Sequence, residues 1–151
     1  MKICFICHAN VCRSFMAQEI LKNILVQKGR NDIEVFSRGT FVFSNLRVPD
    51  KIKNFLKKNN IEYTHHTPTL ISKRDLEEAD MLFVMTKDQL EELTDKYSQF
   101  GDKIFLLLDY CYEKQKDIDD PIDKEGFSFN RAAKNLKQVI EVLATKLTAN
   151  H

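Results

Sequence analysis

The segment from Cys7 to Ser14, which reads Cys-His-Ala-Asn-Val-Cys-Arg-Ser, brings together groups that can act on a bound anion. A loop between a strand and a helix can turn its backbone N–H groups toward an anion while the helix N-terminus points at the same place. In such a loop the thiolate of Cys7 is favoured and can act as a nucleophile. Arg13 can direct two N–H groups at phosphate oxygens, a geometry that Lys does not offer. Ser14 can cap the helix or donate its hydroxyl hydrogen to the Cys7 sulfur.

Cys7 and Arg13 also have ordinary interpretations. A cysteine followed six positions later by an arginine often arises by chance, and a lone cysteine at a strand end is usually a small buried apolar residue. Arg13 would otherwise be a solvated residue of a first helical turn, although a cation is unfavourable beside the helix dipole there. The pair alone is a weak signal, and its place between a strand and a helix strengthens it.

The rest of the chain supplies that strand and helix. Buried strands are predicted at 2–6, 33–37, 81–85 and 103–108. Helices are predicted from Ser14 to near Gly29, at 50–59, at 73–78, and from an N-cap at Thr86 to Leu93. The clearest helical periodicity lies in a tail helix, at Ala132, Ala133, Leu136, Val139, Ile140, Leu143 and Leu147.

Strands that alternate with helices predict βαβ units with right-handed crossovers. The expected fold is α/β, with a four-stranded parallel doubly wound sheet, helices on both faces and a single domain over residues 1–151. In such sheets ligands bind beyond the carboxyl ends of the strands, where the strand order reverses. The first strand ends at Cys7, so this residue lies where that rule places chemistry.

The composition indicates one globular domain without a strong overall charge. The chain has 151 residues, 43% of them hydrophobic, and a formal net charge of +1 from 23 basic and 22 acidic side chains. That balance predicts neither a nucleic-acid nor a membrane partner. The apolar run at the amino terminus is too short for a secretory signal. We therefore expect a cytoplasmic protein.

The positions of the cysteines also favour a cytoplasmic protein. Three of the four cysteines, Cys4, Cys7 and Cys12, crowd into the first strand and its loop, and Cys111 stands apart. This layout suits neither a disulfide framework nor a zinc site. We expect reduced thiols, no metal and no cofactor.

The run from Ile3 to Gln18 resembles the opening signature of the low-molecular-weight protein tyrosine phosphatase family. Other motifs extend the resemblance over essentially the whole chain. The Ser-Arg-Gly-Thr segment at 37–40 is similar to the family's Ser-Ala-Gly-Thr, and His66 with the segment 71–76 is similar to its central His and the following helix start. Asp120-Pro121 is similar to the late Asp-Pro pair that carries the general acid.

The resemblance implies a phosphatase with a covalent two-step mechanism. Cys7 attacks phosphorus, Arg13 and the loop amides hold the equatorial oxygens, and Asp120 protonates the leaving oxygen and later activates water. The implied substrate is a tyrosine-phosphorylated protein, with inorganic phosphate as product and weak inhibitor. The implied substrate-binding residues are His8, Ala9, Asn10, Val11, Cys12, Ser14 and Phe43, and Ser37 and His66 are implied to brace the loop.

Four positions depart from the family pattern. Ala9 stands where the family usually has Gly, and Phe15 stands where it usually has Pro at the helix start. Ile122 and Asp123 replace two Tyr residues that often wall the substrate slot. These last two changes bear on which substrate is bound, whereas the groups that act on phosphate are retained.

Other functions share parts of this pattern. Protein-arginine phosphatases of this fold tend to place Thr at the position of Val11, so an apolar Val11 favours phosphotyrosine. Arsenate reductases of this fold need further cysteines in mid-chain, and none occurs between Arg13 and Tyr110. A phosphocysteine carrier of a sugar-uptake system requires neither Arg13 nor Asp120, and a non-catalytic phosphoprotein-binding module does not need Cys7 and Asp120 together.

Overall fold

The computed structural model describes residues 1–149, so the last two residues of the predicted domain lie outside the described residues. Its four strands form one parallel sheet in the order β2-β1-β3-β4. Their bounds are Lys2–Cys7 (β1), Glu34–Gly39 (β2), Met81–Val84 (β3) and Ile104–Leu106 (β4). The chain passes from β1 outward to β2 and then back across β1 to β3. The carboxyl end of β1, at Cys7, is therefore the point where strand order reverses.

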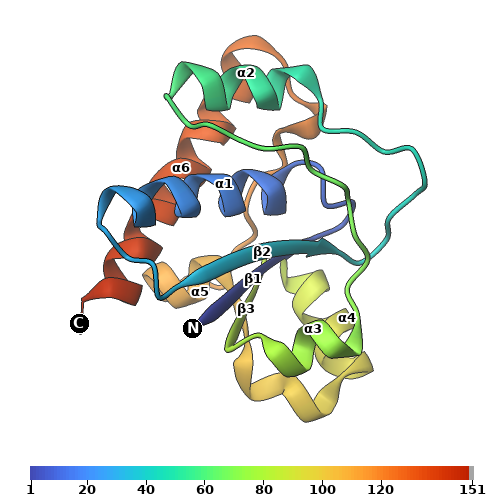
Figure 1. The fold of residues 1–151 in the computed structure, drawn as a ribbon. Helices are drawn as coiled ribbons and strands as arrows, with labels where there is room; N and C mark the ends of the chain where they lie inside the picture. Colours follow the sequence, from blue (N-terminus) through green and yellow to red (C-terminus); the bar gives the residue numbers. More distant parts are fainter. Residues whose placement is uncertain (150–151) are drawn as a thin grey trace.

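Helices cover both faces of the sheet (Figure 1). On one face lie α1 (Arg13–Gln27), α2 (Asp50–Lys58) and α6 (Gly126–Thr148), and on the other lie α3 (Lys73–Glu78) and α4 (Lys87–Lys96). The short helix α5 (Leu107–Tyr112) contacts α6, and two 3-10 helices occupy Ser98–Lys103 (η1) and Pro121–Asp123 (η2). The predicted α/β fold with a doubly wound parallel sheet is confirmed. No helix within residues 1–149 has the length and apolar character needed to cross a membrane.

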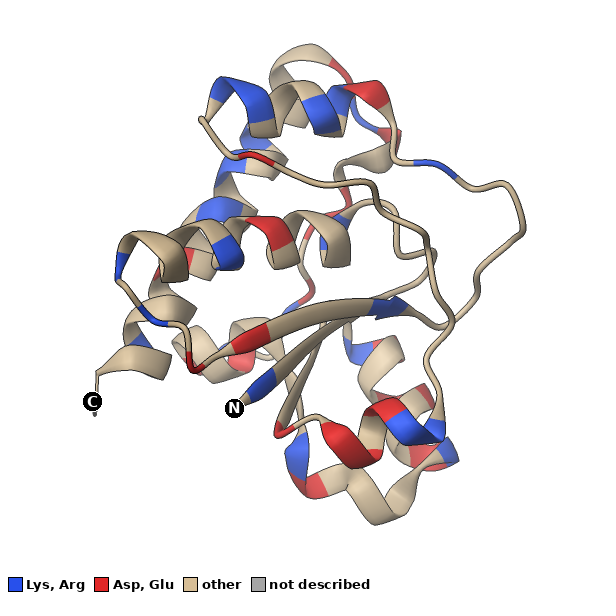
Figure 2. Ribbon diagram, viewed as in Figure 1, with Lys and Arg blue, Asp and Glu red and all other residues tan. Residues whose placement is uncertain are grey.

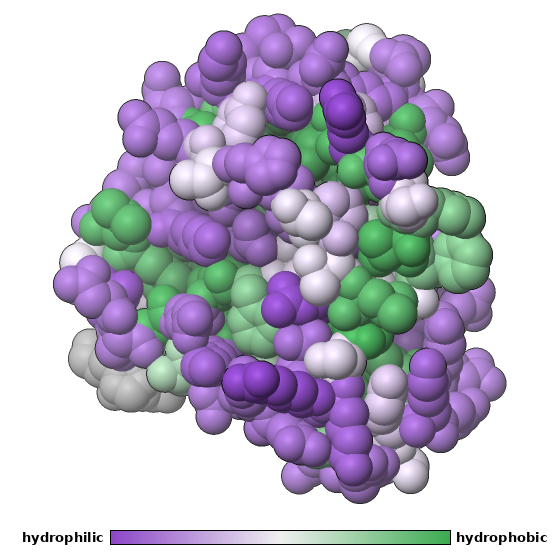
Figure 3. Space-filling model, turned by 45° about the vertical axis from the view of Figure 1, so that its right-hand side comes forward, coloured by the Kyte–Doolittle hydropathy of each residue, from purple (hydrophilic) through white to green (hydrophobic). Residues whose placement is uncertain are grey.

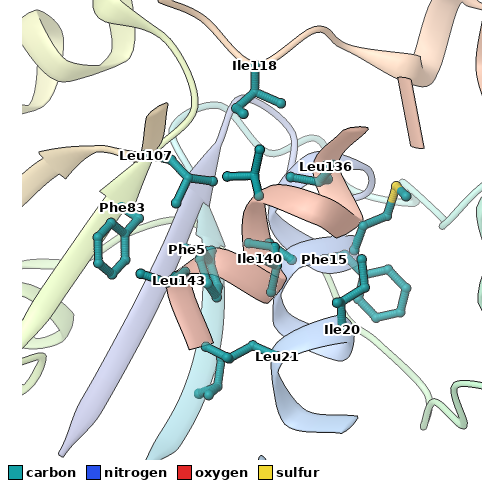
Figure 4. Close-up of a cluster of buried hydrophobic side chains, with 14 of the residues drawn as sticks. Phe5, Phe15, Ile20, Leu21, Phe83, Leu107, Ile118, Leu136, Ile140 and Leu143 are labelled. Atoms are coloured by element: carbon teal, nitrogen blue, oxygen red, sulfur yellow. The ribbon is translucent and has the colours of Figure 1, made fainter. Parts of the chain in front are cut away.

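The central strand β1 is buried on both faces, which explains why it reads as a continuous apolar run. Ile3, Phe5 and Cys7 face the layer of α1 and α6, whereas Cys4 and Ile6 belong to a second cluster beneath α3 and α4. In Figure 4 the α6 side chains Leu136, Ile140 and Leu143 lie against Phe5 of β1 and against Ile20 and Leu21 of α1. The strand that carries Cys7 is thus fixed by packing from both sides.

The fourth strand is shorter than the sequence predicted, so the range 103–108 was wrong at both ends. β4 spans only Ile104–Leu106, Lys103 ends η1, and Leu107 and Leu108 begin α5. Leu107 is fully buried in the α6 layer although it is helical. A short buried apolar run has the same hydrophobic pattern in a strand and in a helix, so periodicity could not separate the two.

Gly39 ends β2 directly beside the loop that follows β1. A Cβ at this position would lie 2.7 Å from the carbonyl oxygen of His8 and 3.1 Å from the Cβ of Asn10. Both of those atoms belong to the loop, and the backbone of Gly39 also pairs with the segment around Leu70. The missing side chain lets two segments approach the loop closely.

Replacing Gly39 by Ala should therefore destabilise the protein by about 1–3 kcal/mol, the usual effect of forcing extra volume into a packed site. Chemical denaturation measures this change in the free energy of unfolding. The matched control is Gly101→Ala in η1, where an added Cβ meets nothing within 4 Å, and it should leave stability nearly unchanged or slightly raised. Equal denaturation midpoints for Gly39→Ala and the wild type would contradict this interpretation of the close approach.

Candidate active site

The loop from His8 to Cys12 joins the carboxyl end of β1 to the start of α1. Cys7 pairs in register with Gly39 at the end of β2 and is buried to 3% exposure. α1 begins at Arg13 with no side-chain cap on its first turn, so its first backbone N–H groups have no side-chain partner. The segment therefore has the strand–loop–helix arrangement expected of an anion-binding turn.

Asn10 holds the loop in shape from within. Its backbone adopts the left-handed conformation, with φ of 61°, which Asn tolerates better than most residues. Its side-chain nitrogen donates to Ser14 Oγ and to Ser37 Oγ, each at 2.9 Å, and its side-chain oxygen accepts the backbone N–H of Thr69 at 3.0 Å. This fully buried amide thus connects the loop to α1, to β2 and to the segment before α3.

The hydrogen bonds of Asn10 also determine where the hydroxyl hydrogens of Ser37 and Ser14 point. Ser37 Oγ accepts from Asn10 and donates to Gln18 Oε1 at 2.7 Å, so its single hydrogen is used. Ser14 Oγ also accepts from Asn10 and lies 2.8 Å from Cys7 Sγ, so its own hydrogen is free to point at that sulfur. A hydroxyl that donates to sulfur stabilises the thiolate form, which is the nucleophile.

His66 closes the loop from the opposite side. Its Nε2 lies 2.7 Å from the carbonyl oxygen of Asn10, which only accepts, so Nε2 carries the hydrogen. Its ring also stacks on Phe15, with centroids 4.5 Å apart. Burial lowers the pKa of His66, against the hydrogen bond to Asn10, which raises it. The neutral ring is therefore the favoured form, and Phe15 provides the surface on which it stacks.

Arg13, at the end of the loop, forms an ion pair with Asp120. Arg13 Nη2 lies 3.3 Å from Asp120 Oδ2, and Arg13 Nη1 donates to the carbonyl oxygen of Ile118 at 2.8 Å. Asp120 keeps 38% of its side chain exposed and also accepts the N–H of Ile122 at the start of η2. The neighbouring Asp119 is exposed and forms no such contact with the loop. The geometry thus brings together Cys7, Arg13 and Asp120.

Cys12 is a buried thiol next to this pair. Burial raises its pKa far above the usual value, and the nearby Asp120 carboxylate and Cys7 raise it further. The thiol therefore stays protonated and can donate a hydrogen bond to Asp120. The four cysteines, all within the described residues, are free and buried. No group of three His, Cys, Asp or Glu side chains within residues 1–149 is arranged to hold a metal ion.

Two anchors position the segment that carries Asp120. On one side Ile118 is buried in the core (Figure 4). Its N–H donates to the carbonyl oxygen of Met85 at 2.8 Å. On the other side Lys51 of α2 donates to the carbonyl oxygens of Ile122 at 2.5 Å and Lys124 at 2.7 Å. Lys51 thus holds residues 118–124, here called the acid segment, to α2. Sequence reasoning missed it because its partners lie 71 and 73 positions away.

Aromatic rings stand beside the loop. Phe43, which the resemblance implied as a slot residue, is 57% exposed, and its ring meets Phe41 edge-on with centroids 4.6 Å apart. Phe41 is 51% exposed and stacks on His8 at 5.5 Å. Ala9 is partly exposed, whereas Val11 is buried. Sequence reasoning missed Phe41, which lies in an irregular bend after β2 where periodicity gives no signal.

Comparisons with known proteins find similar sequences over nearly the whole chain. A family model described as low molecular weight phosphotyrosine protein phosphatase matches residues 2–151. The chain is 30% identical over 146 residues to the protein-arginine-phosphatase of Geobacillus stearothermophilus, covering 97% of this chain and 95% of that protein. It is 28% identical over 127 residues to the low molecular weight protein-tyrosine-phosphatase PtpA of Staphylococcus epidermidis, covering 83% of this chain and 80% of that protein.

A solved structure extends the comparison to three dimensions. The YwlE arginine phosphatase, in a C7S mutant with a phosphorylated active site serine, matches this fold with a TM-score of 0.89 at 25% identity. The match covers 97% of this chain and 95% of that one. The similarity in fold therefore extends over nearly the whole chain.

Lys51 offers a direct test of how the acid segment is held. Lys51→Met keeps an unbranched side chain but removes the ammonium group that donates to both carbonyls and lies 5.5 Å from the centroid of the Phe129 ring, so Asp120 should lose its fixed position. We expect kcat/KM for phenyl phosphate, whose leaving oxygen needs a proton, to fall roughly tenfold. The value for 2,4-dinitrophenyl phosphate, which leaves without a proton, should change little.

The matched control is Lys58→Met, at the other end of α2, whose side chain forms no hydrogen bond or ion pair with residues 1–149. It should leave both kcat/KM values unchanged. A uniform loss for both substrates in Lys51→Met would show that the lysine supports folding in general and not the acid segment.

Proposed function

The chain belongs to the low molecular weight phosphotyrosine protein phosphatase family, and on that premise we propose that it hydrolyses protein phosphotyrosine through a phosphocysteine on Cys7. The observation that carries the proposal is the position of Cys7 Sγ 2.8 Å from Ser14 Oγ, with Arg13 and Asp120 paired at the same loop. The chain is a protein phosphatase and hence a hydrolase. Its substrate and the roles of single residues are the proposed part.

The residues support two balanced steps. In the first, the Cys7 thiolate forms an S–P bond while the P–O bond to the tyrosine oxygen breaks, and Asp120 gives its proton to that oxygen. In the second, a water oxygen bonds to phosphorus while Asp120 takes the water proton and the S–P bond breaks. Inorganic phosphate leaves, and the thiolate and the protonated Asp120 are restored.

Arg13 and the loop amides stabilise the charge that spreads over the equatorial oxygens in both steps. Arg13 is held by the Ile118 carbonyl and by Asp120. A phosphate in the loop would take the remaining N–H groups of the guanidinium. The phosphorylated active site serine of the related YwlE structure supports a phosphoryl group carried at this loop.

The surroundings of the loop favour an aryl phosphate. Val11 is buried and apolar, and the ring of His8, the residue after Cys7, stacks on the ring of Phe41. A tyrosine ring gains from stacking on such rings, and it brings no charge that must be paired. The thiolate mechanism also needs a reducing compartment, so we infer a cytoplasmic location.

Phosphoarginine is the second candidate substrate. The protein-arginine-phosphatase of Bacillus subtilis is 27% identical over 147 residues, covering 97% of both chains, a fuller coverage than that of PtpA. A guanidinium leaving group needs a polar partner in the slot. Val11 offers only methyl groups, and the Thr that these phosphatases tend to place there offers a hydroxyl.

A matched set of three peptides tests the substrate. Among peptides that differ only in the phosphorylated residue, kcat/KM should be highest for phosphotyrosine, lower for phosphoarginine and lowest for phosphoserine. The phosphotyrosine value should exceed the phosphoarginine value by roughly 10²-fold. Val11→Thr adds a hydroxyl beside the bound substrate, so it should reduce the ratio of kcat/KM for the phosphotyrosine peptide to kcat/KM for the phosphoarginine peptide. Faster hydrolysis of the phosphoarginine peptide by the wild type would replace this proposal with the second candidate.

Replacing the acid is the second test. Asp120→Asn should lower kcat/KM for a phosphotyrosine peptide by about 10²- to 10⁴-fold, the usual contribution of general acid catalysis. The loss should shrink as the leaving group improves. Asp119→Asn is the control because its side chain is exposed next to the same Pro-containing turn, and it should retain activity. An equal loss in both variants would remove Asp120 from the role of acid.

A further inference from the structure

A cavity of about 740 Å³ opens beside the loop, between the connection that follows β2 and the segment that precedes α3. Its walls include Phe15, Phe43, Arg47, Lys53, Tyr63 and His66. Figure 3 turns this side of the molecule forward and shows apolar surface bordered by hydrophilic surface there. The groups that act on phosphate, Cys7, Arg13 and Asp120, are not part of its lining. The cavity is therefore a neighbouring site and not the catalytic loop itself.

The charged side chains that line the cavity are all basic. Arg47 is the only charged residue between Thr40 and Pro49, and no Asp or Glu occurs between Tyr63 and Ser72 (Figure 2). Neither the Arg47 side chain nor the Lys53 side chain forms a hydrogen bond or ion pair with any residue in the described part of the chain. Since His66 is kept neutral by burial, these two side chains supply the positive charge at neutral pH. Two unpaired cations at one cavity favour an anionic ligand.

The cavity is connected to the catalytic loop by a row of rings. His8 follows Cys7, its ring stacks on Phe41, and Phe41 meets Phe43, which lines the cavity. The two ring-to-ring steps are 5.5 Å and 4.6 Å. An extended peptide advances about 3.4 Å per residue. A peptide whose phosphorylated residue lies at Cys7 thus reaches the cavity within roughly three residues.

We propose that this cavity binds the carboxylate of an acidic residue two or three positions from the phosphorylated tyrosine of the substrate protein. Arg47 and Lys53 pair with the carboxylate, and Phe43, Phe15 and Tyr63 contact the aliphatic part of the same side chain. The proposal rests on the proposed function, because the loop must hold phosphotyrosine for the neighbouring residue to reach the cavity. It adds a sequence preference that the loop alone does not provide.

The test uses a phosphotyrosine peptide with alanine at every neighbouring position and four derivatives, each with one Glu at −3, −2, +2 or +3. At least one Glu should raise kcat/KM roughly threefold to tenfold over the all-alanine peptide, as expected for one carboxylate paired with two partly exposed cations. Gln at the same position should give no gain. Raising the salt concentration from about 0.05 M to 0.5 M should remove most of the gain.

Charge reversal assigns the effect to the cavity. In the double variant Arg47→Glu, Lys53→Glu, the preferred Glu peptide should become a poorer substrate than the variant's own all-alanine reference, and a Lys peptide a better one. Lys58→Glu carries a charge reversal on the same helix α2 away from the cavity, and it should keep the wild-type preference.

The peptide results distinguish failure of the cavity proposal from failure of the proposed function. A wild type that hydrolyses the all-alanine peptide but gains nothing from Glu at any position overturns the cavity proposal and leaves the proposed function intact. A gain that survives equally in the double variant and in Lys58→Glu also overturns it. Failure to hydrolyse any phosphotyrosine peptide overturns the proposed function, and this use of the cavity fails with it.

Discussion

The side-chain amide of Asn10 makes three hydrogen bonds, and the geometry around Cys7, the proposed nucleophile, depends on them. It joins the loop to Ser14 of α1, to Ser37 of β2 and to the backbone of Thr69. A buried polar group that loses a partner costs about 1–3 kcal/mol, so the fully satisfied arrangement is strongly preferred over any partly satisfied one. Because Ser14 accepts from Asn10, its hydrogen is directed at Cys7. The chemistry of the sulfur is thus set by a residue that does not touch it.

The proposed catalytic groups are held in two different ways. Cys7 and Asn10 are buried, and the side chains that hydrogen-bond to them come from elements packed against the same strand. Asp120 lies on a partly exposed segment fixed by Ile118 on one side and by Lys51 on the other. A fixed loop around Cys7 beside the more exposed Asp120 suits the proposed reaction. The phosphoryl group stays in the loop while the leaving group departs and water then enters.

The fold and the loop were predictable because their signals are local. The apolar run of β1, the periodicity of α6 and the residues at the two ends of the loop lie within short stretches of sequence. The range of the fourth strand was wrong because Leu107 and Leu108 are buried in either conformation. Lys51 and the cavity at Arg47 and Lys53 were not predictable. They depend on contacts between segments far apart in the chain, for which spacing carries no information.

The central claim is that the phosphoryl group passes through the Cys7 sulfur, and trapping that intermediate tests it most directly. Wild-type protein mixed with a phosphotyrosine peptide and quenched within one turnover is digested and sequenced by mass spectrometry. We predict one phosphoryl group on Cys7, with Cys12 and Ser14 of the same peptide unmodified. Continued turnover with no phosphorylated enzyme, or with the phosphoryl group on another residue, would contradict the claim.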